Sequence, residues 1–595
     1  MQSEKPSPLA SKWVLIAFGL VAVGLVALQA GSTLGGDLRG NDDMMRMQQV
    51  RDLLSGERGW YDVSQRRLLT PEGGEMHWSR LPDLFIAAII FLLQPLIGTR
   101  MAEGVAAPLW PMMQLGWVLA MVAVCLKRLG ATLSGQLAGM FFLATSFALF
   151  NLLPGRIDHH GLGLALTLTG FAALLSPIRN ARSAFIGGAC VPVMLSVAIE
   201  NLPAAAFLIA GFSVAWIVRG GKEVGRLRIF GATLVVAALL TYVFDAPGAQ
   251  GVRAVCDAYG QSHFVALLVG GAGLFVIATA APSVETWRLR LALITVAGAV
   301  ALATFIVINP SCLGNPYAGV LDYVRTGWLS GVGEARNVAA VFADDPTQAV
   351  FYFGFGLAGV IAALICLMRS PDGLRLVRSF LLAFCVLGFA VSLWQLRAAM
   401  MSHVFAAIAG GLLTGFVFHH WRENRGGHAA LVLVLVVLLA SPAGWRLPGL
   451  LLPETKDKTH TADYDCTSTA ALAQVAAAPS MVVFTPIDLG APLIYHTPHY
   501  AMAAPYHRNV HALARTLNIY TGPVSRAREK MSRSGATHLL YCPGLNEMAA
   551  YAERAPNGFA AALESGNLPN WLVPTTSEDN RTGDPVLYSI VFDRN

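Results

Sequence analysis

Two polar segments in an otherwise apolar sequence carry side chains that could bind a metal ion. Asp42 and Asp43 stand together at the start of a stretch with helical, amphipathic periodicity. Asp158, His159 and His160 follow one of the apolar runs. Carboxylate oxygens and neutral imidazole nitrogens are competent ligands for Mg²⁺, Mn²⁺ or Zn²⁺. The two segments therefore predict a divalent-metal site.

Two further polar residues could complete such a site. Glu334 lies in the polar stretch 328–335, and Arg397 stands at the end of an apolar run that has no charge after Arg378. An arginine at a membrane boundary indicates function, because its planar fork suits phosphate. Each segment has a structural alternative: the aspartates could cap helices, Glu334 could be solvated, and Arg397 could extend to the interface.

The composition shows which elements must position these residues. The chain has 595 residues, of which 55% are hydrophobic and 13% charged, and its mean hydropathy is +0.55. These values are typical of a polytopic α-helical membrane protein. We expect about thirteen membrane-spanning helices, near residues 13–31, 105–126, 131–152, 161–177, 184–199, 202–218, 227–244, 263–281, 289–308, 349–368, 377–395, 400–419 and 428–443.

The distribution of basic residues predicts the topology. They lie in alternate short connections, such as 127–128 and 422–425, which favours a cytoplasmic N-terminus and an uncleaved first span. The net charge of +6 forms no patch large enough for a nucleic acid. The run 83–98 would break the alternation as a span, so we expect it to lie along the outer interface. Segments 32–104, 309–348 and everything after about 444 then face outward.

Two domains follow from this topology. Residues 1–443 form a transmembrane domain with the external loops 32–104 and 309–348, and residues 444–595 form a periplasmic α/β domain. Strands are expected at 481–484 and 538–541, and a helix at 526–534.

The cysteines divide into two groups. Cys125, Cys190, Cys366 and Cys385 lie in apolar runs and are expected to be buried thiols. Cys256, Cys312, Cys466 and Cys542 fall in segments placed outside the cytoplasm, where the disulfides Cys256–Cys312 and Cys466–Cys542 are allowed. The spacing alone does not fix this pairing.

Taken in order, the four polar segments resemble the catalytic subunit of oligosaccharyltransferases and, more broadly, the GT-C superfamily of membrane glycosyltransferases. Asn41 and Asp42 with Arg51 and Asp52 are similar to the first external loop of the bacterial enzymes. The Asp-His-His segment at 158–160 is similar to the second motif of the archaeal enzymes, and 332–334 to the motif of the fifth external loop.

The resemblance implies roles for individual residues. Asp42, Asp158, His160 and Glu334 would surround the metal, and Arg397 would hold the lipid phosphate. Asp42 or Glu334 would orient or deprotonate the acceptor, and the sugar would be transferred with inversion. Asp43 remains an alternative to Asp42, and His159 an alternative to His160. Mg²⁺ or Mn²⁺ is the expected ion, with Zn²⁺ as the alternative.

One departure from that family bears on the acceptor. The Trp-Trp-Asp motif that reads the acceptor sequon has no counterpart, since the sequence contains no Trp-Trp pair. The resemblance covers roughly residues 10–440, so the tail would define another acceptor. His77 and Arg80 in the first external loop, and His507 and Arg508 in the tail, are further candidates for a sugar or phosphate site, with exposed turns as the alternative.

The sequence thus predicts a glycosyltransferase of the bacterial inner membrane, with its tail in the periplasm. It would move a sugar or glycan from a polyprenyl phosphate or diphosphate to a polysaccharide, lipid or lipopolysaccharide acceptor. Its expected partners are this donor, the acceptor and membrane lipids. The alternatives are an oligosaccharyltransferase that acts on protein, and a non-catalytic transporter or flippase of lipid-linked sugar.

Overall fold

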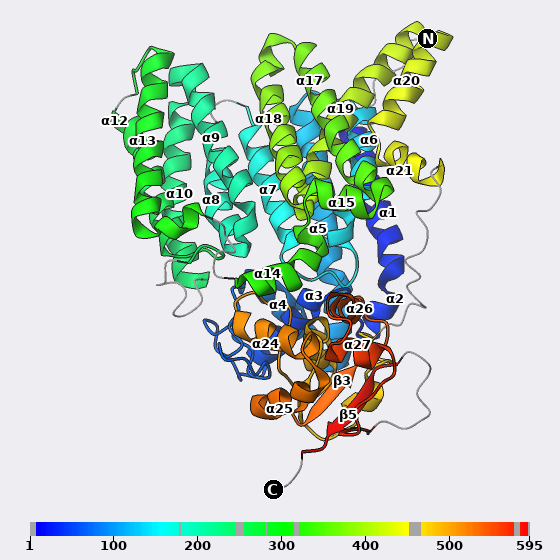
Figure 1. Cartoon of the computed structure of the whole chain (residues 1–595). Coiled ribbons are helices and arrows are strands. Elements are labelled where there is room, and N and C mark those ends of the chain that lie inside the picture. Colours follow the sequence, from blue (N-terminus) through cyan, green and yellow to red (C-terminus); the bar gives the residue numbers. More distant parts are fainter. Residues whose placement is uncertain are drawn as a thin grey trace.

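The computed structural model describes residues 8–177, 180–245, 255–280, 282–314, 320–451, 466–575 and 584–592. Apolar helices stand side by side in the upper part of Figure 1, and the C-terminal part of the chain lies below them. The predicted spans correspond to the helices α1 (Pro8–Ala27), α5 (Thr99–Arg128), α6 (Leu133–Ala144), α7 (His160–Leu174), α8 (Ala181–Val197), α9 (Leu202–Arg219), α10 (Val224–Asp245), α12 (Gln261–Ala280), α13 (Trp287–Ile308), α17 (Phe355–Met368), α18 (Asp372–Trp394), α19 (Ala399–Asn424) and α20 (Gly427–Leu439).

The number of full-length spans is smaller than thirteen. In the described ranges, nine helices are long and apolar enough to cross a membrane, or ten if α20 and the start of α21 (Pro442–Leu451), which meet at 78°, count as one broken span. α6, α7 and α8 are shorter than the roughly 20 residues that a span requires. The chain is a multi-pass membrane protein in which short helices are packed among full-length ones.

Close packing between α6 and α19 shows how such a short helix is held. A Cβ atom at Gly411 of α19 would lie 2.6 Å from the Cα atom of Gly139 in α6, so the two backbones touch. The end of α6 continues into the 3₁₀ helix η2 (Phe147–Leu152), which leads directly to the Asp-His-His segment. This contact therefore helps to place the chain that leads to a predicted metal-ligand segment.

The first external segment lies between the apolar helices and the tail (Figure 1) and contains α2 (Gly31–Leu34), α3 (Asn41–Leu54) and α4 (Leu81–Ile97). α3 and α4 are joined by a buried ion cluster. Asp83 lies 2.5 Å from Nη1 of Arg46 and 2.9 Å from Nη1 of Arg80, and all three side chains are almost completely buried. α4 is the interfacial run of the sequence, and its position along an interface stays a prediction.

The second external segment contains α14 (Asp322–Gly327), α15 (Val338–Asp344), α16 (Pro346–Ala349) and the π-helix η8 (Val350–Gly354), which leads into α17. Val324 and Trp328 pack against Ile487 and Leu513 of the tail. The hydroxyl groups of Tyr323 and Thr521 lie 2.7 Å apart. The tail thus supports the segment that carries Glu334.

The tail contains a five-stranded sheet in the order β2-β1-β3-β5-β4, with β1–β2 and β1–β3 parallel and the other pairs antiparallel. The predicted strands and helix at 481–484, 538–541 and 526–534 are confirmed. The elements are α22 (Ala473–Ala476), β1 (Val482–Phe484), α23 (Gly490–His496), β2 (Tyr500–Ala501), α24 (Val510–Tyr520), α25 (Val524–Ser534), β3 (His538–Tyr541), α26 (Asn546–Arg554), α27 (Phe559–Glu564), β4 (Leu572–Pro574) and β5 (Val586–Ile590).

The tail shares its core with the first external segment. Met45, Met76 and Trp78 belong to the same buried cluster as Val483 and Leu540 of the sheet. The backbone extends this contact, because the amide of residue 69 donates to the carbonyl of Ala501 at 2.8 Å. The sheet domain from Cys466 on therefore shares a core with part of the segment 32–104, as far as its residues are described.

Both disulfides that the sequence allows, but does not fix, are present. Cys256 is bonded to Cys312 and Cys466 to Cys542, with Cα atoms 5.2 Å and 6.3 Å apart. The four cysteines of the apolar runs are buried free thiols, as expected.

Candidate active site

A cavity of about 1040 Å³ lies between the apolar helices and the tail. Its walls come from the start of α3, the Asp-His-His segment, the ends of α8, α18 and α19, and the tail. Asp42, Asp158, His160, Glu334 and Arg397, the five residues to which the sequence assigned a role, all line it.

Asp42 and Asp43 have different surroundings at the first turn of α3. Asp43 is fully buried and accepts hydrogen bonds from the backbone amides of Ile157 at 2.7 Å and Asp158 at 3.0 Å. Its other oxygen lies 3.2 Å from the guanidinium group of Arg156. Asp43 thus stabilises the position of the Asp-His-His segment, whereas Asp42 lines the cavity.

The carboxylate of Asp42 is available for a ligand. It makes no hydrogen bond or ion pair with any residue in the described part of the chain. Burial, and next the neighbouring carboxylate of Glu334, raise the pKa of Asp42 above its ordinary value. A cation in the cavity would relieve both effects, which makes Asp42 the better ligand candidate of the two aspartates.

His160 is oriented by a residue that the sequence analysis did not select. Its Nδ1 lies 2.7 Å from Oε1 of Glu200, in the short 3₁₀ helix η3 (Ile199–Asn201) between α8 and α9. Its Nε2 then points to Oδ2 of Asp158 at 4.0 Å and to Oε2 of Glu334 at 3.9 Å. A carboxylate on one ring nitrogen that leaves the other free is the usual support of a metal-binding histidine.

Asp158 is held in its charged form. Burial alone would raise its pKa, but His160 and Arg156 outweigh burial and lower the pKa of Asp158 to about 2. The Arg156 guanidinium lies 3.1 Å from Oδ2 of Asp158. Arg156 keeps this stabilising charge beside Asp158 even when His160 is neutral, the form in which a histidine binds a metal ion.

The donor types of these residues suit a divalent ion, although the groups are not equally close. The donor atoms of His159, His160 and Glu200 all lie within 4.8 Å of one another, whereas no three of Asp42, Asp158, His160 and Glu334 meet that limit. His159 remains an alternative ligand, because its Nε2 lies 3.5 Å from Oε1 of Glu200. The oxygen and nitrogen donors suit Mg²⁺, Mn²⁺ or Zn²⁺.

Arg397 lies beside this group. It follows α18 in the 3₁₀ helix η9 (Leu396–Ala398), and its Nη1 is 3.4 Å from Oε2 of Glu200. The backbone amide of Leu396 donates to the carbonyl of Arg336 at 2.9 Å, which ties η9 to the segment of Glu334. Glu200 thus contacts both the histidine pair and the arginine.

The remaining candidates differ in position. Arg80 is enclosed between α3 and α4, where it contacts Asp83 and donates to backbone carbonyls, and it is absent from the described residues that line the cavity. His77 and His507 line the cavity, and Arg508 lies behind them in an ion pair with Asp257.

No known family description matches the chain, and no curated protein matches its sequence. Solved structures of the oligosaccharyltransferase of Archaeoglobus fulgidus do match. The apo form has a TM-score of 0.69 and 14% identity, over 96% of this chain and 73% of that one. The complex with an inhibitory peptide and a dolichol-phosphate has a TM-score of 0.66 and 14% identity, over 93% and 72%. The complex with Zn and sulfate has a TM-score of 0.60 and 14% identity, over 96% and 73%.

The chain therefore has the same fold as the oligosaccharyltransferase of Archaeoglobus fulgidus. The fold expected from the sequence is confirmed.

Proposed function

We propose that this protein is an inverting, metal-dependent glycosyltransferase that uses a polyprenyl-phosphate-linked or polyprenyl-diphosphate-linked sugar donor. The observation that carries the proposal is the orientation of His160: Glu200 holds its Nδ1, and its Nε2 faces Asp158 and Glu334 in a cavity that Arg397 also enters. The proposed metal ligands and the proposed phosphate-binding arginine thus line one cavity at the end of the apolar helices, where a lipid-linked donor would arrive.

The metal would be held by Asp42, Asp158, His160 and Glu334. When bound, it would offset negative charge on the departing phosphate. Arg397 would bind the same phosphate through its guanidinium fork. Asp42 or Glu334 would also orient the acceptor or take its proton, since both carboxylates face the cavity.

The cavity would face the periplasm of a bacterial inner membrane. Support comes from the two disulfides, which form in an oxidising compartment. The basic connections of the apolar helices favour the same orientation. The tail domain at this face would then contact the acceptor.

The proposed acceptor is a cell-envelope polysaccharide, lipid or lipopolysaccharide. The oligosaccharyltransferase fold favours a second candidate, transfer to protein. The first is preferred because no Trp-Trp pair occurs in the sequence. Labelled sugar recovered in periplasmic protein would reverse this preference.

Transfer by the purified protein tests the reaction class. The untreated protein is expected to transfer radiolabelled sugar from total polyprenyl-linked donors to an envelope acceptor. After chelator treatment the sugar should stay on the donor. Transfer should resume when Mg²⁺, Mn²⁺ or Zn²⁺ is restored. Transfer that persists at the full rate in chelator would contradict the metal dependence. A parent protein that transfers no sugar from any donor would favour the transporter or flippase alternative.

Arg397→Ala is expected to weaken donor binding roughly tenfold to hundredfold, because a charge-assisted hydrogen bond to phosphate is lost. Arg397→Lys should recover only part of this loss, since an ammonium group lacks the planar fork. The KM for the donor measures the effect. Arg325→Ala is the matched control, because Arg325 is half exposed and pairs with Asp322. An unchanged KM in Arg397→Ala would remove Arg397 from the donor site.

A further inference from the structure

A second group of ligand-type side chains lies at another part of the cavity wall. His77 comes from the first external segment, Asp257 from the segment before α12, and His507 from the tail. One donor atom from each lies within 4.8 Å of the other two. Three segments that are far apart in the sequence therefore present two imidazoles and one carboxylate to a common point.

The geometry of this group is close to that of a metal site. Nε2 of His507 lies 2.9 Å from Oδ2 of Asp257, and the rings of His77 and His507 are 4.7 Å apart between centroids. Ligands around a tetrahedral zinc ion are about 3.3 Å apart at the usual bond lengths. Small side-chain movements would bring all three donors to that separation.

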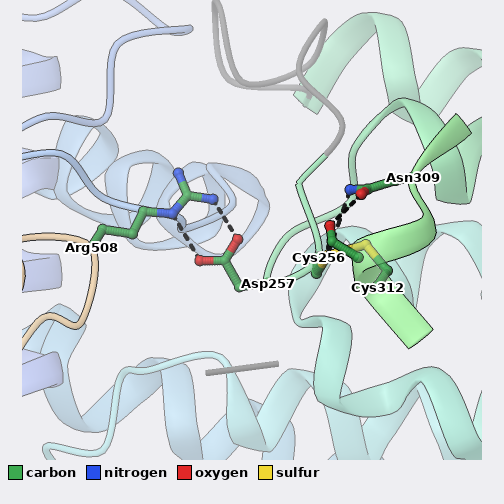
Figure 2. The surroundings of a disulfide bond; sticks show 6 residues. Cys256, Asp257, Asn309, Cys312 and Arg508 are labelled. Atoms are coloured by element: carbon green, nitrogen blue, oxygen red, sulfur yellow. Dashed lines mark hydrogen bonds and ion pairs between the residues drawn. A yellow bond between two sulfur atoms is a disulfide. The ribbon is translucent and has the colours of Figure 1, made fainter. Parts of the chain in front are cut away.

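Asp257 lies between an ion pair and a disulfide (Figure 2). Arg508 binds both of its carboxylate oxygens, through Nε and Nη2, at 2.8 Å each. Asp257 also follows Cys256, whose disulfide with Cys312 anchors the backbone. A carboxylate oxygen has two lone-pair directions. Oδ2 is contacted by both Arg508 and His507, whereas Oδ1 is contacted by Arg508 and keeps one direction for an ion.

His77 adds an independent observation. Its Nδ1 is enclosed by protein and has no hydrogen-bond partner among the described residues. A buried ring nitrogen without a partner costs free energy, which an ion coordinated by this Nδ1 would offset.

We propose that His77, Asp257 and His507 form a second metal site, distinct from the centre near Asp158, that binds a divalent ion of the zinc type. Two imidazoles and a carboxylate favour Zn²⁺ over Mg²⁺, which prefers oxygen ligands only. The ion links the first external segment, the disulfide-anchored segment and the tail. It closes one wall of the cavity.

Metal stoichiometry tests this site without reference to transfer activity. The full-length protein is stripped with chelator, equilibrated with Zn²⁺, freed of excess ion and analysed for zinc by mass spectrometry. His77→Ala and His507→Gln are each expected to hold one zinc ion fewer than the parent. His511→Ala, which removes an exposed histidine of the same tail, is the matched control and should equal the parent.

The outcomes separate the two centres. Asp158→Asn should leave the zinc of the second site in place, so a failure of the proposed reaction does not affect this result. Equal zinc content in the parent, His77→Ala and His507→Gln would overturn the proposal. If the variants do not fold, the test is amide hydrogen exchange of residues 505–509 in the parent protein. Zn²⁺ is expected to slow this exchange. An unchanged exchange rate would also overturn the proposal.

Discussion

Asp42→Asn is expected to lower the rate of sugar transfer by about a thousandfold, equivalent to about 4 kcal/mol in the activation free energy. The substitution keeps the size of the side chain and removes a charged ligand from the proposed metal centre. Folding should be unaffected, because the carboxylate makes no hydrogen bond or ion pair within the described ranges. Single-turnover transfer and thermal unfolding of the same preparation measure both effects.

Asp43→Asn is the matched control for that experiment. The carboxylate of Asp43 accepts hydrogen bonds from two backbone amides and contacts Arg156. Removing its charge should therefore lower the unfolding temperature as well as the transfer activity. Asp42→Asn with the parental rate would exclude Asp42 as a ligand. If Asp43→Asn reduces transfer activity without lowering the unfolding temperature, Asp43 is the metal ligand in place of Asp42.

Asp83→Ala is expected to cost about 3 to 5 kcal/mol of stability. The side chain is fully buried between Arg46 and Arg80, and its removal leaves two buried cations without their common counter-charge. Because the same cluster joins α3 to α4, transfer activity should fall with stability. Chemical unfolding in detergent micelles measures the loss.

Asp322→Ala is the control for the buried cluster. Its side chain is 88% exposed and pairs only with Arg325 in the described structure, so the expected change is below about 0.5 kcal/mol. An equally small change in the free energy of unfolding for Asp83→Ala would show that Arg46 and Arg80 do not depend on Asp83 for their stability.

Local patterns in the sequence were enough to predict the helices and to select polar segments that line the cavity. Runs of about 20 apolar residues identify helices, and the order of Asp42, Asp158, Glu334 and Arg397 resembles a known family. The count of full-length spans was too high, since apolar composition does not reveal where a helix stops. α6 illustrates this: its apolar run continues to 152, but the α-helix ends at Ala144.

Residues that act through long-range contacts were missed. Glu200 is one carboxylate between the apolar runs 184–199 and 202–218, and its position at a boundary was the only available signal. Its distances to His160 and Arg397 arise from the packing of separate helices. Arg80 was selected because it is basic and lies in a segment predicted to be external. In the structure it forms a buried ion pair with Asp83, three positions further on, and so has a structural role.

The core that the tail shares with the segment 32–104 has a consequence for biosynthesis. Arg67 donates a hydrogen bond to the carbonyl of Thr497, 430 residues later. At ordinary translation rates this interval takes roughly 20 to 90 s. During that time Met45, Met76 and Trp78 lack the strands that bury them, so the newly made N-terminal segment depends on protection by chaperones or by the membrane surface until the last part of the chain emerges.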